Sequence, residues 1–303
     1  MIAITQSIMS TFVLLLSMTI LSSVHGDRVW FGNNNTVGAS SQQQMITQNY
    51  ESHNIFIVNG TTVTLDGYTI TAPSKNDDGE DAVRVEDATF IAKDGIIWGG
   101  LGVGGSGVTV STTRNSDYPP GVATFEAGME VYGGDATRER TSKGGDAVQI
   151  LQSGSVATFN GGRFVPGTGC TVKVCGVATE TGNAIQIIQG KAIVKGGSFE
   201  GNFYNLQGDI EIHGCVEYDE ETEKITGTLL DGVDIDVLYA QPNGQNQPPV
   251  IVYDSEVCRV QERDDVTPPK EPSSGGWHVM NKGVWHVSLT SFVLGFIVKK
   301  SFQ

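Results

Sequence analysis

A short motif recurs along this chain at almost even spacing, and it constrains the fold more than any other feature. Ala88-Thr89-Phe90, Ala123-Thr124-Phe125, Ala157-Thr158-Phe159 and Ala192-Ile193-Val194 begin 35, 34 and 35 residues apart. A fixed period of this size is typical of stacked repeats, in which each unit buries its apolar face only against a neighbour. We therefore expect successive coils that stack into one elongated domain.

Each copy has the pattern of a strand, a corner and a second strand. Because alternate side chains share a face of a strand, the Ala and Phe of a copy are expected to point inward and the Thr outward. Gly128, Gly162 and Gly197 follow three positions after the apolar residue and can turn the backbone sharply, whereas Lys93 stands there in the first copy. The next bulky residues, Val131, Phe164 and Phe199, start the second strand.

A second echo precedes three of the copies and completes the prediction of the fold. Residues 81–85, 146–150 and 183–187 all have apolar side chains at alternate places. Together with the many glycines, these patterns predict an all-β fold, a parallel β-helix (β-solenoid) with Gly-rich corners. Residues 101–120, 135–143 and 168–181 have the composition of long loop insertions, and we expect them to form one flank where a binding surface would lie.

The N-terminus has the features of a secretory signal. Residues 1–26 contain no Lys, Arg, Asp or Glu, and Phe12–Leu21 is an apolar core followed by small residues. We expect a signal peptide and a mature chain that begins near Asp27. A membrane anchor is the alternative, but this apolar run is shorter than a span of about 20 residues.

The rest of the chain divides by composition. Residues 27–54 read as a lead-in or N-terminal cap, 55–258 as the solenoid and 259–276 as a linker. Residues 55–71 fit either the first coil or a hairpin that caps the stack, because two turn dipeptides interrupt them. The tail over 277–303 ends with an apolar run and Lys299-Lys300. A glycolipid-anchor signal, a single membrane span and a tail without a membrane role remain open.

A secreted protein matures in an oxidising compartment, so its four cysteines are expected to pair. Three connectivities exist, and we favour Cys170 with Cys175 and Cys215 with Cys258. A zinc site is the alternative, but the chain has no Cys-x-x-Cys pair. Asn34 and Asn59 head N-glycosylation sequons. The expected location is outside the cell or on the extracellular face of its surface.

The charge balance restricts the partners. Lys and Arg number 19 against 34 Asp and Glu, which gives a net charge of −15. Nucleic acid is therefore not expected as a ligand. Divalent cations, basic surfaces and neutral sugars match this charge better, and a polyanionic polysaccharide would need a cation bridge.

The strand pattern, the glycine corners and the secretory signal resemble the right-handed parallel β-helix proteins of the pectin-lyase-like class. Gly145-Asp146-Ala147-Val148-Gln149-Ile150 is similar to the Gly-Asp-Asp-x-Ile-x-Ile strand of polygalacturonases. The resemblance implies a hydrolase with paired carboxylates, one giving a proton to the leaving oxygen and one activating water. The chain departs from that pattern, because the doubled Asp is single and no Gly-His-Gly or Arg-x-Lys occurs. A lyase would instead need clustered acids that hold calcium, together with a base.

Two groups of carboxylates are candidate sites. Asp81 and Asp146 occupy matching places in two repeats and are candidate catalytic residues, although Asn183 at the third equivalent place favours a turn role. Calcium is the cofactor that an acidic cluster near the end of the domain would bind, and a solvated acidic face is the alternative. Its candidate ligands are Glu217, Asp219, Glu220, Asp231, Asp234 and Asp236.

Taken together, these features favour a secreted or surface-tethered, non-catalytic module that binds extracellular polysaccharide, matrix or another cell. A polysaccharide lyase or glycoside hydrolase of the pectin-lyase-like class, with or without calcium, is the second hypothesis. A purely structural wall or adhesion protein is the third. Reaction products, glycan affinity without products and no glycan affinity would distinguish them.

Overall fold

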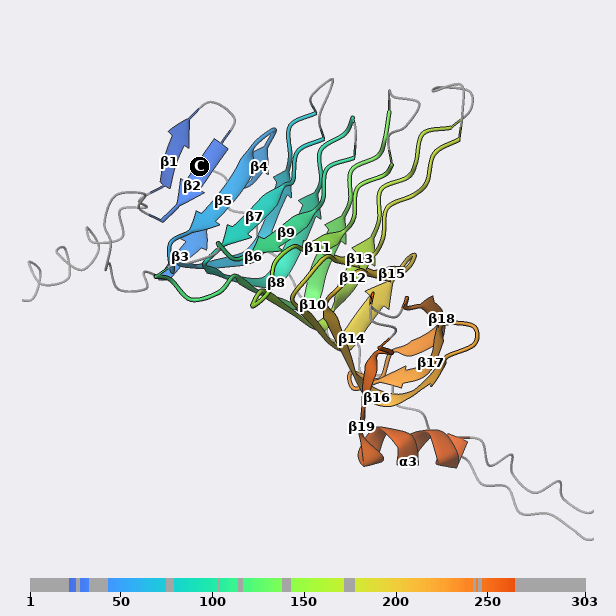
Figure 1. The fold of residues 1–303 in the computed structure, drawn as a ribbon. Helices are drawn as coiled ribbons and strands as arrows, with labels where there is room; N and C mark the ends of the chain where they lie inside the picture. Colours follow the sequence, from blue (N-terminus) through green and yellow to red (C-terminus); the bar gives the residue numbers. More distant parts are fainter. Residues whose placement is uncertain are drawn as a thin grey trace, which may run out of the picture. The chain divides into compact units, whose positions relative to one another are not determined.

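Two long and largely parallel β-sheets form the described part of the chain, as the computed structural model shows (Figure 1). The structure describes residues 22–25, 28–32, 43–74, 79–102, 104–113, 117–137, 143–171, 178–241, 244 and 247–264, with no description of the side chains at 22–25, 236–237 and 260–264. These residues contain 19 strands and one helix. The predicted all-β solenoid is confirmed at this level.

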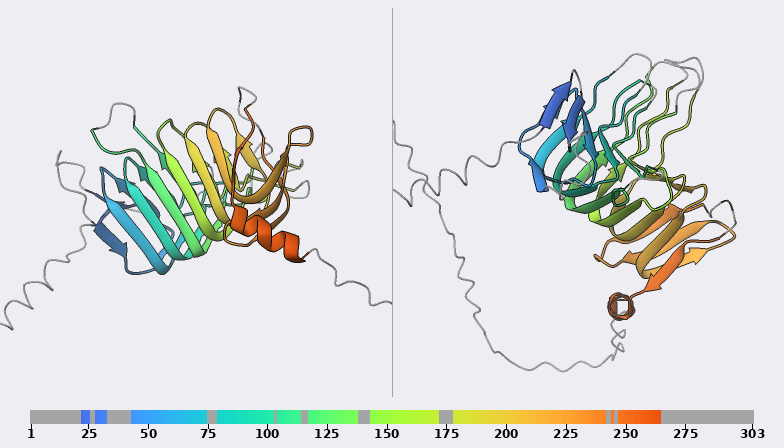
Figure 2. Two further views of the ribbon diagram at one scale, coloured as in Figure 1. Left: turned by 90° about the horizontal axis from the view of Figure 1, so that it is seen from below. Right: turned by 60° about the vertical axis from the view of Figure 1, so that its left-hand side comes forward.

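The sheets differ in length. Sheet A has eight strands, in the order β1 (Ser22–His25), β2 (Arg28–Phe31), β5 (Asn54–Val58), β7 (Val83–Glu86), β9 (Val108–Ser111), β11 (Val148–Ile150), β13 (Ile185–Ile187) and β15 (Phe203–Asn205). Sheet B has eleven strands, which are β3 (Gln43–Ile46), β4 (Tyr50–Glu51), β6 (Thr62–Thr71), β8 (Thr89–Trp98), β10 (Val122–Tyr132), β12 (Val156–Val165), β14 (Lys191–Phe199), β16 (Asp209–Asp219), β17 (Lys224–Leu229), β18 (Asp234–Tyr239) and β19 (Val250–Tyr253). From β5 to β16 the chain alternates between the sheets, so each coil adds one strand to each. The long strands of sheet B lie side by side in Figure 2.

The core between the sheets contains the predicted columns of aromatic rings. Phe125 and Phe159 stack with centroids 5.2 Å apart and planes 16° apart. Phe164 and Phe199 stack at 5.1 Å and 14°. Phe159 and Phe164 meet edge to face at 4.9 Å, which joins the two columns. Phe125 of β10 and Phe159 and Phe164 of β12 are fully buried, and Phe199 of β14 extends the cluster to a third coil.

The first repeat is aligned differently from the prediction. Phe90 lies opposite Ala123, and Ala92 lies opposite Phe125. The corner of this coil is therefore Gly95, whose φ is +129°, and not Lys93. A glycine at a left-handed φ can set a sharp corner at no steric cost, so the corner and not the local Ala-Thr-Phe likeness sets the register. The offset also places a large side chain against a small one in each pair.

The predicted insertions do share one flank, but the first is shorter than predicted. The stretch 101–120 contains β9, which lies between β7 and β11 in sheet A. Gly102 forms a bridge with Ala136, and the amide of Ala136 donates to the carbonyl of Thr168 at 2.9 Å. Backbone hydrogen bonds therefore join successive insertions where the structure describes them.

Glycines form a close seam at the base of this flank. The amide of Gly134 donates to Gly105 O, that of Gly145 to Gly134 O and that of Gly167 to Gly145 O, each at 2.8 Å. A Cβ on Gly134 would lie 1.9 Å from the carbonyl oxygen of Gly100. The outgoing and returning segments of the coils thus touch backbone to backbone, with no space for side chains.

The stack begins before residue 55. β2 pairs in parallel with β5, and β3 and β4 pair in parallel with β6. The hairpin alternative is wrong, because β5 and β6 belong to different sheets, and Asp66 and Gly67 form an irregularity within β6 and not a turn. At the end of the predicted signal, β1 pairs antiparallel with β2. Residues 1–21 and the tail over 277–303 lie outside the described residues.

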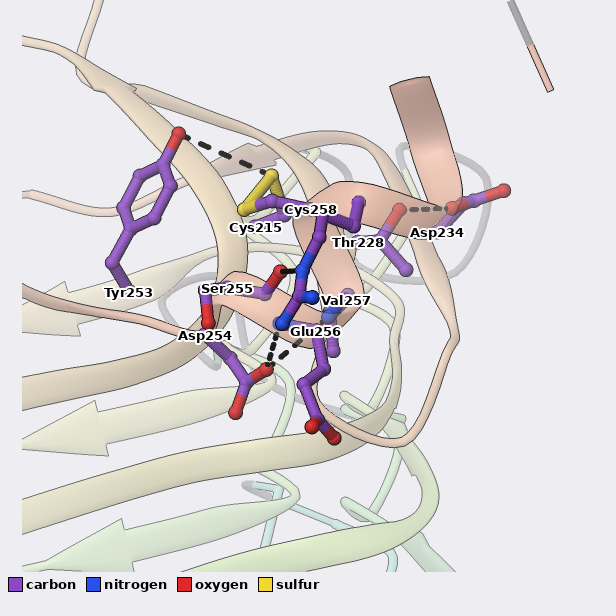
Figure 3. The surroundings of a disulfide bond; sticks show 10 residues. Cys215, Thr228, Asp234, Tyr253, Asp254, Ser255, Glu256, Val257 and Cys258 are labelled. Atoms are coloured by element: carbon purple, nitrogen blue, oxygen red, sulfur yellow. Dashed lines mark hydrogen bonds between the residues drawn. A yellow bond between two sulfur atoms is a disulfide. The ribbon is translucent and has the colours of Figure 1, made fainter. Parts of the chain in front are cut away.

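Antiparallel strands and a disulfide close the C-terminal end. β16 pairs in parallel with β14 up to Ile212 and then antiparallel with β17 from Gly214. Asp254 caps the N-terminus of helix α3 (Ser255–Asp264), because its carboxylate accepts hydrogen bonds from the amides of Glu256 and Val257 (Figure 3). The predicted linker from residue 259 therefore begins within a helix.

The predicted disulfide between Cys215 and Cys258 is present, with Cα atoms 4.9 Å apart. It fastens α3 to β16, as Figure 3 shows. Cys170 is buried, but its predicted partner Cys175 lies outside the described residues, so that bond stays a prediction.

Candidate functional site

The structure brings the catalytic candidates Asp81 and Asp146 into one column, but it surrounds them with donors from the next coil. Asp81 accepts hydrogen bonds from the Ser106 amide at 3.0 Å and from the Thr109 hydroxyl at 2.7 Å. Asp146 accepts from the backbone and side-chain nitrogens of Asn183 at 2.7 and 2.8 Å. Burial raises the pKa of both carboxyls. Each carboxylate therefore joins two neighbouring coils. Both lie just before a strand of sheet A, where the chain returns from the glycine seam.

The acidic candidates near the C-terminal end whose side chains are described make separate local contacts. Asp231 accepts from the amides of Gly197 and Val233, and Asp234 accepts from the Thr228 hydroxyl at 2.6 Å. Asp219 closes its own turn through the amides of Glu221 and Thr222. Glu217 faces outward on β16, Glu220 lies in the turn after that strand, and the side chain of Asp236 is not described. Within the described residues no three His, Cys, Asp or Glu side chains form a metal-binding group.

The structure describes one of the two predicted N-glycosylation sites, Asn59. Asn34 lies outside the described residues. Asn59 lies in the turn between β5 and β6 with a φ of 57°. Its side chain is half-buried, and the hydroxyl residue of its sequon, Thr61, is buried. Glycosylation at either asparagine stays a prediction.

The surface best formed for binding lies on the outer face of sheet B, beyond the corner glycines. Trp98 of β8 and Tyr132 of β10 lie in register and stack with centroids 3.8 Å apart and planes 7° apart. Glu130 and Arg163 occupy the adjacent outward column on β10 and β12. We call Trp98, Tyr132, Glu130, Arg163 and Glu200 the Trp98 platform.

Hydrogen bonds hold the polar members of the platform in place. The Tyr132 hydroxyl donates to Glu130, and Arg163 donates from Nε to Glu200 Oε1 at 3.0 Å and from an Nη to the Tyr132 hydroxyl at 3.3 Å. The Glu130 carboxylate raises the pKa of Tyr132, and Glu200 raises the pKa of Arg163. The tyrosine therefore stays neutral and the arginine charged at neutral pH.

The Trp98 indole has one described aromatic stacking partner, which is Tyr132. Tyr132 covers one ring face, and the column continues on the other side with Thr71, a much smaller residue. Trp98 is 42% exposed, and the side chains of Arg163 and Glu200 are about half exposed. A flat ring face beside fixed hydrogen-bonding groups can hold a ligand that is apolar on one side and polar at its edge.

The sequence contains a signal for two members of this platform. Trp98-Gly99-Gly100 and Tyr132-Gly133-Gly134 repeat an aromatic residue before two glycines, 34 residues apart. That spacing equals one coil, so the two rings had to lie on neighbouring strands. Glu200 could not be found in this way, because it lies outside the repeated positions.

A hollow lies at the other end of the sheet B strands from the Trp98 platform. It has a volume of about 280 Å³ and is lined by residues such as Ser155, Gln189, Lys191 and Asp209. Its described lining contains no aromatic ring, and Gln189 is hydrogen-bonded to Gln207 at 3.0 Å. It is therefore a weaker candidate than the Trp98 platform for a sugar ring.

The chain matches no protein-family model, no curated protein and no solved structure. Among the described residues, no helix is both long enough and apolar enough to span a membrane. The candidate site therefore has to be judged on its own chemistry.

Proposed function

We propose that this protein is an extracellular, non-catalytic β-solenoid module that binds a polysaccharide on the Trp98 platform. The observation that carries this proposal is the partly exposed Trp98 indole, stacked on Tyr132 beside Glu130 and the Arg163–Glu200 pair. A pyranose ring presents C–H groups on one side, and these pack against the electron-rich face of an indole. Its hydroxyls then reach the carboxylate and guanidinium groups at the edge.

The charge of the chain favours a neutral glycan. Its net charge is −15, and the platform itself has two glutamates for one arginine. A polyanionic polysaccharide would be repelled unless a divalent cation lay between the two. We therefore expect affinity for neutral glycans that a chelator does not change.

The disulfide supports an extracellular setting, because such bonds persist in oxidising compartments. Secretion through the N-terminal signal and tethering through the C-terminal tail belong to the proposal. Membership of the pectin-lyase-like class does too, and the parallel coils support it.

Affinity for a panel of neutral and acidic polysaccharides, measured with and without chelator, tests the proposal. Trp98→Ala should weaken binding at least about tenfold, or about 1.4 kcal/mol. Trp30→Ala is the matched control, because Trp30 stacks on Phe56 on sheet A, away from the platform. Equal affinity of wild type and Trp98→Ala would refute the platform.

The same samples separate the alternative functions. An enzyme would release reducing or unsaturated ends, and Asp146→Ala would abolish that release. A structural wall or adhesion protein would show no glycan affinity at all.

A further inference from the structure

Sheet B has a second outward surface, on the other side of the corner glycines from the Trp98 platform. The proposed function assigns no role to this surface. The first halves of β6, β8, β10 and β12 place two β-branched side chains each on this outer face. One in-register column consists of Thr62, Thr89, Val122 and Val156. The parallel column consists of Thr64, Ile91, Thr124 and Thr158. We call these two columns the β-branched array.

Every member of the array is stiff. Two heavy atoms on Cβ restrict χ1, and each strand of the array is paired on both sides. The inward neighbours, such as Ala123 and Ala157, are fully buried and fix the backbone beneath. A ligand that binds here would cost little side-chain entropy, because the side chains are already ordered.

The array is uncharged in an acidic protein. Across four strands its two columns contain only Thr, Val and Ile, while the chain has a net charge of −15. Charged residues border the array on two sides: Lys191 pairs with Glu211 beyond the last strand, and Asp66, Lys93 and Glu126 follow the second column along their strands. A charged ligand or a metal ion would find no partner on the array.

The threonine hydroxyls of the array are free to meet a ligand. None of the five threonines makes a side-chain hydrogen bond to a described residue, although other threonines of the same sheets do, such as Thr109 and Thr228. Methyl and hydroxyl groups therefore lie together on a surface of half-exposed side chains. A sugar chain would need aromatic faces or directional charged groups, which the array lacks.

The spacing of the array is regular in two directions. Neighbouring strands lie about 4.8 Å apart, and alternate residues of one strand lie about 6.7 Å apart. Groups fixed at two regular repeats can meet the ordered oxygen atoms of a crystal surface such as a face of ice. One hydroxyl gains nothing over liquid water, but many fixed groups that match a lattice at once add their small contributions.

We infer that the β-branched array binds the surface of ice. The stacked coils repeat one pair of positions on successive strands, and this repetition is what a crystalline surface requires of its ligand. The left view of Figure 2 shows these strands side by side.

Slow growth of ice in a solution of the purified full-length chain tests this inference. The fraction of protein in the ice is compared with that of a non-binding reference protein in the same drop. Wild type should be enriched, and Thr124→Tyr/Thr158→Tyr should fall to the reference level, because two bulky rings lift the lattice off the array. Thr124→Ala/Thr158→Ala, which adds no bulk, should lose enrichment as well.

Thr69→Tyr is the matched control, since Thr69 lies on β6, a strand of the array, but beyond the Gly67 corner and outside the array. It should partition like wild type, and so should Trp98→Ala. Exclusion of wild type from ice, or equal enrichment of the array variants and wild type, would overturn the inference. Binding to crystalline cellulose or chitin that the array variants lose, without enrichment in ice, would overturn it in favour of a polysaccharide surface.

Discussion

The ring stack between Phe125 and Phe159 provides a quantitative test of how the coils are aligned. Their centroids lie 5.2 Å apart, both rings are fully buried, and each belongs to a different coil. Replacing either ring by leucine keeps the site apolar but removes the ring contact. Aromatic pairs contribute about 0.5–1.5 kcal/mol beyond their buried area. We therefore expect a coupling energy of about 0.5–1.5 kcal/mol in the double-mutant cycle of Phe125→Leu and Phe159→Leu.

The cycle of Phe90→Leu and Phe125→Leu is the matched control. Phe90 lies opposite Ala123, and it forms no described ring pair with Phe125. Its coupling to Phe125 should stay below about 0.5 kcal/mol. Urea unfolding followed by circular dichroism gives all the free energies, with the slope m as a check that the variants unfold alike. Equal coupling in the two cycles would refute the alignment of the first repeat, in which Phe90 and not Ala88 lies opposite Ala123.

Three further perturbations test other parts of the structure. Gly134→Ala should destabilise the fold by several kcal/mol, since its Cβ would lie 1.9 Å from Gly100 O. Gly232→Ala is the control: nothing lies within 4 Å of its Cβ, so it should cost only roughly 1–2 kcal/mol for its left-handed φ. Similar unfolding midpoints for the two variants would contradict the close glycine seam. Burial raises the pKa of Asp146 in the folded state, so its contribution to stability falls as the pH rises from about 4 through that raised pKa. Asp146→Asn should therefore gain stability relative to wild type between pH 4 and pH 7 in urea titrations, and a constant difference would argue against a buried carboxylate. Cys215→Ser/Cys258→Ser should lower the unfolding free energy by about 2–4 kcal/mol, measured under non-reducing conditions; an unchanged value would show that the bond adds no stability.

Repetition made much of the core predictable. The Phe159 and Phe164 positions follow from alternation within strands and from the spacing between copies, both of which are local properties. The register of the first copy was not predictable in the same way. Phe90 sits in an Ala-Thr-Phe sequence like the others, but its coil is aligned by Gly95, and only the neighbouring strand shows which signal sets the alignment.

The sites were harder to predict than the core. The column of Asp81 and Asp146 follows from the repeat, yet the donors that surround them come from the following coil. The stack of Trp98 on Tyr132 follows from the 34-residue spacing of the two rings, but its link to Arg163 and Glu200 depends on side chains of the next coils. Helix α3 was missed because its signals, the Asp254 cap and the Cys258 link, lie next to a stretch with the composition of a linker.

The in-register stacking of coils underlies both the Trp98 platform and the β-branched array. Nitroxide labels at Thr64 and Ile193 test it most directly, because these residues lie in one outward column, four strand spacings apart. Double electron–electron resonance should give a narrow distribution around the roughly 19 Å that four spacings span. A broad distribution, or a mean beyond about 30 Å, would contradict the stack.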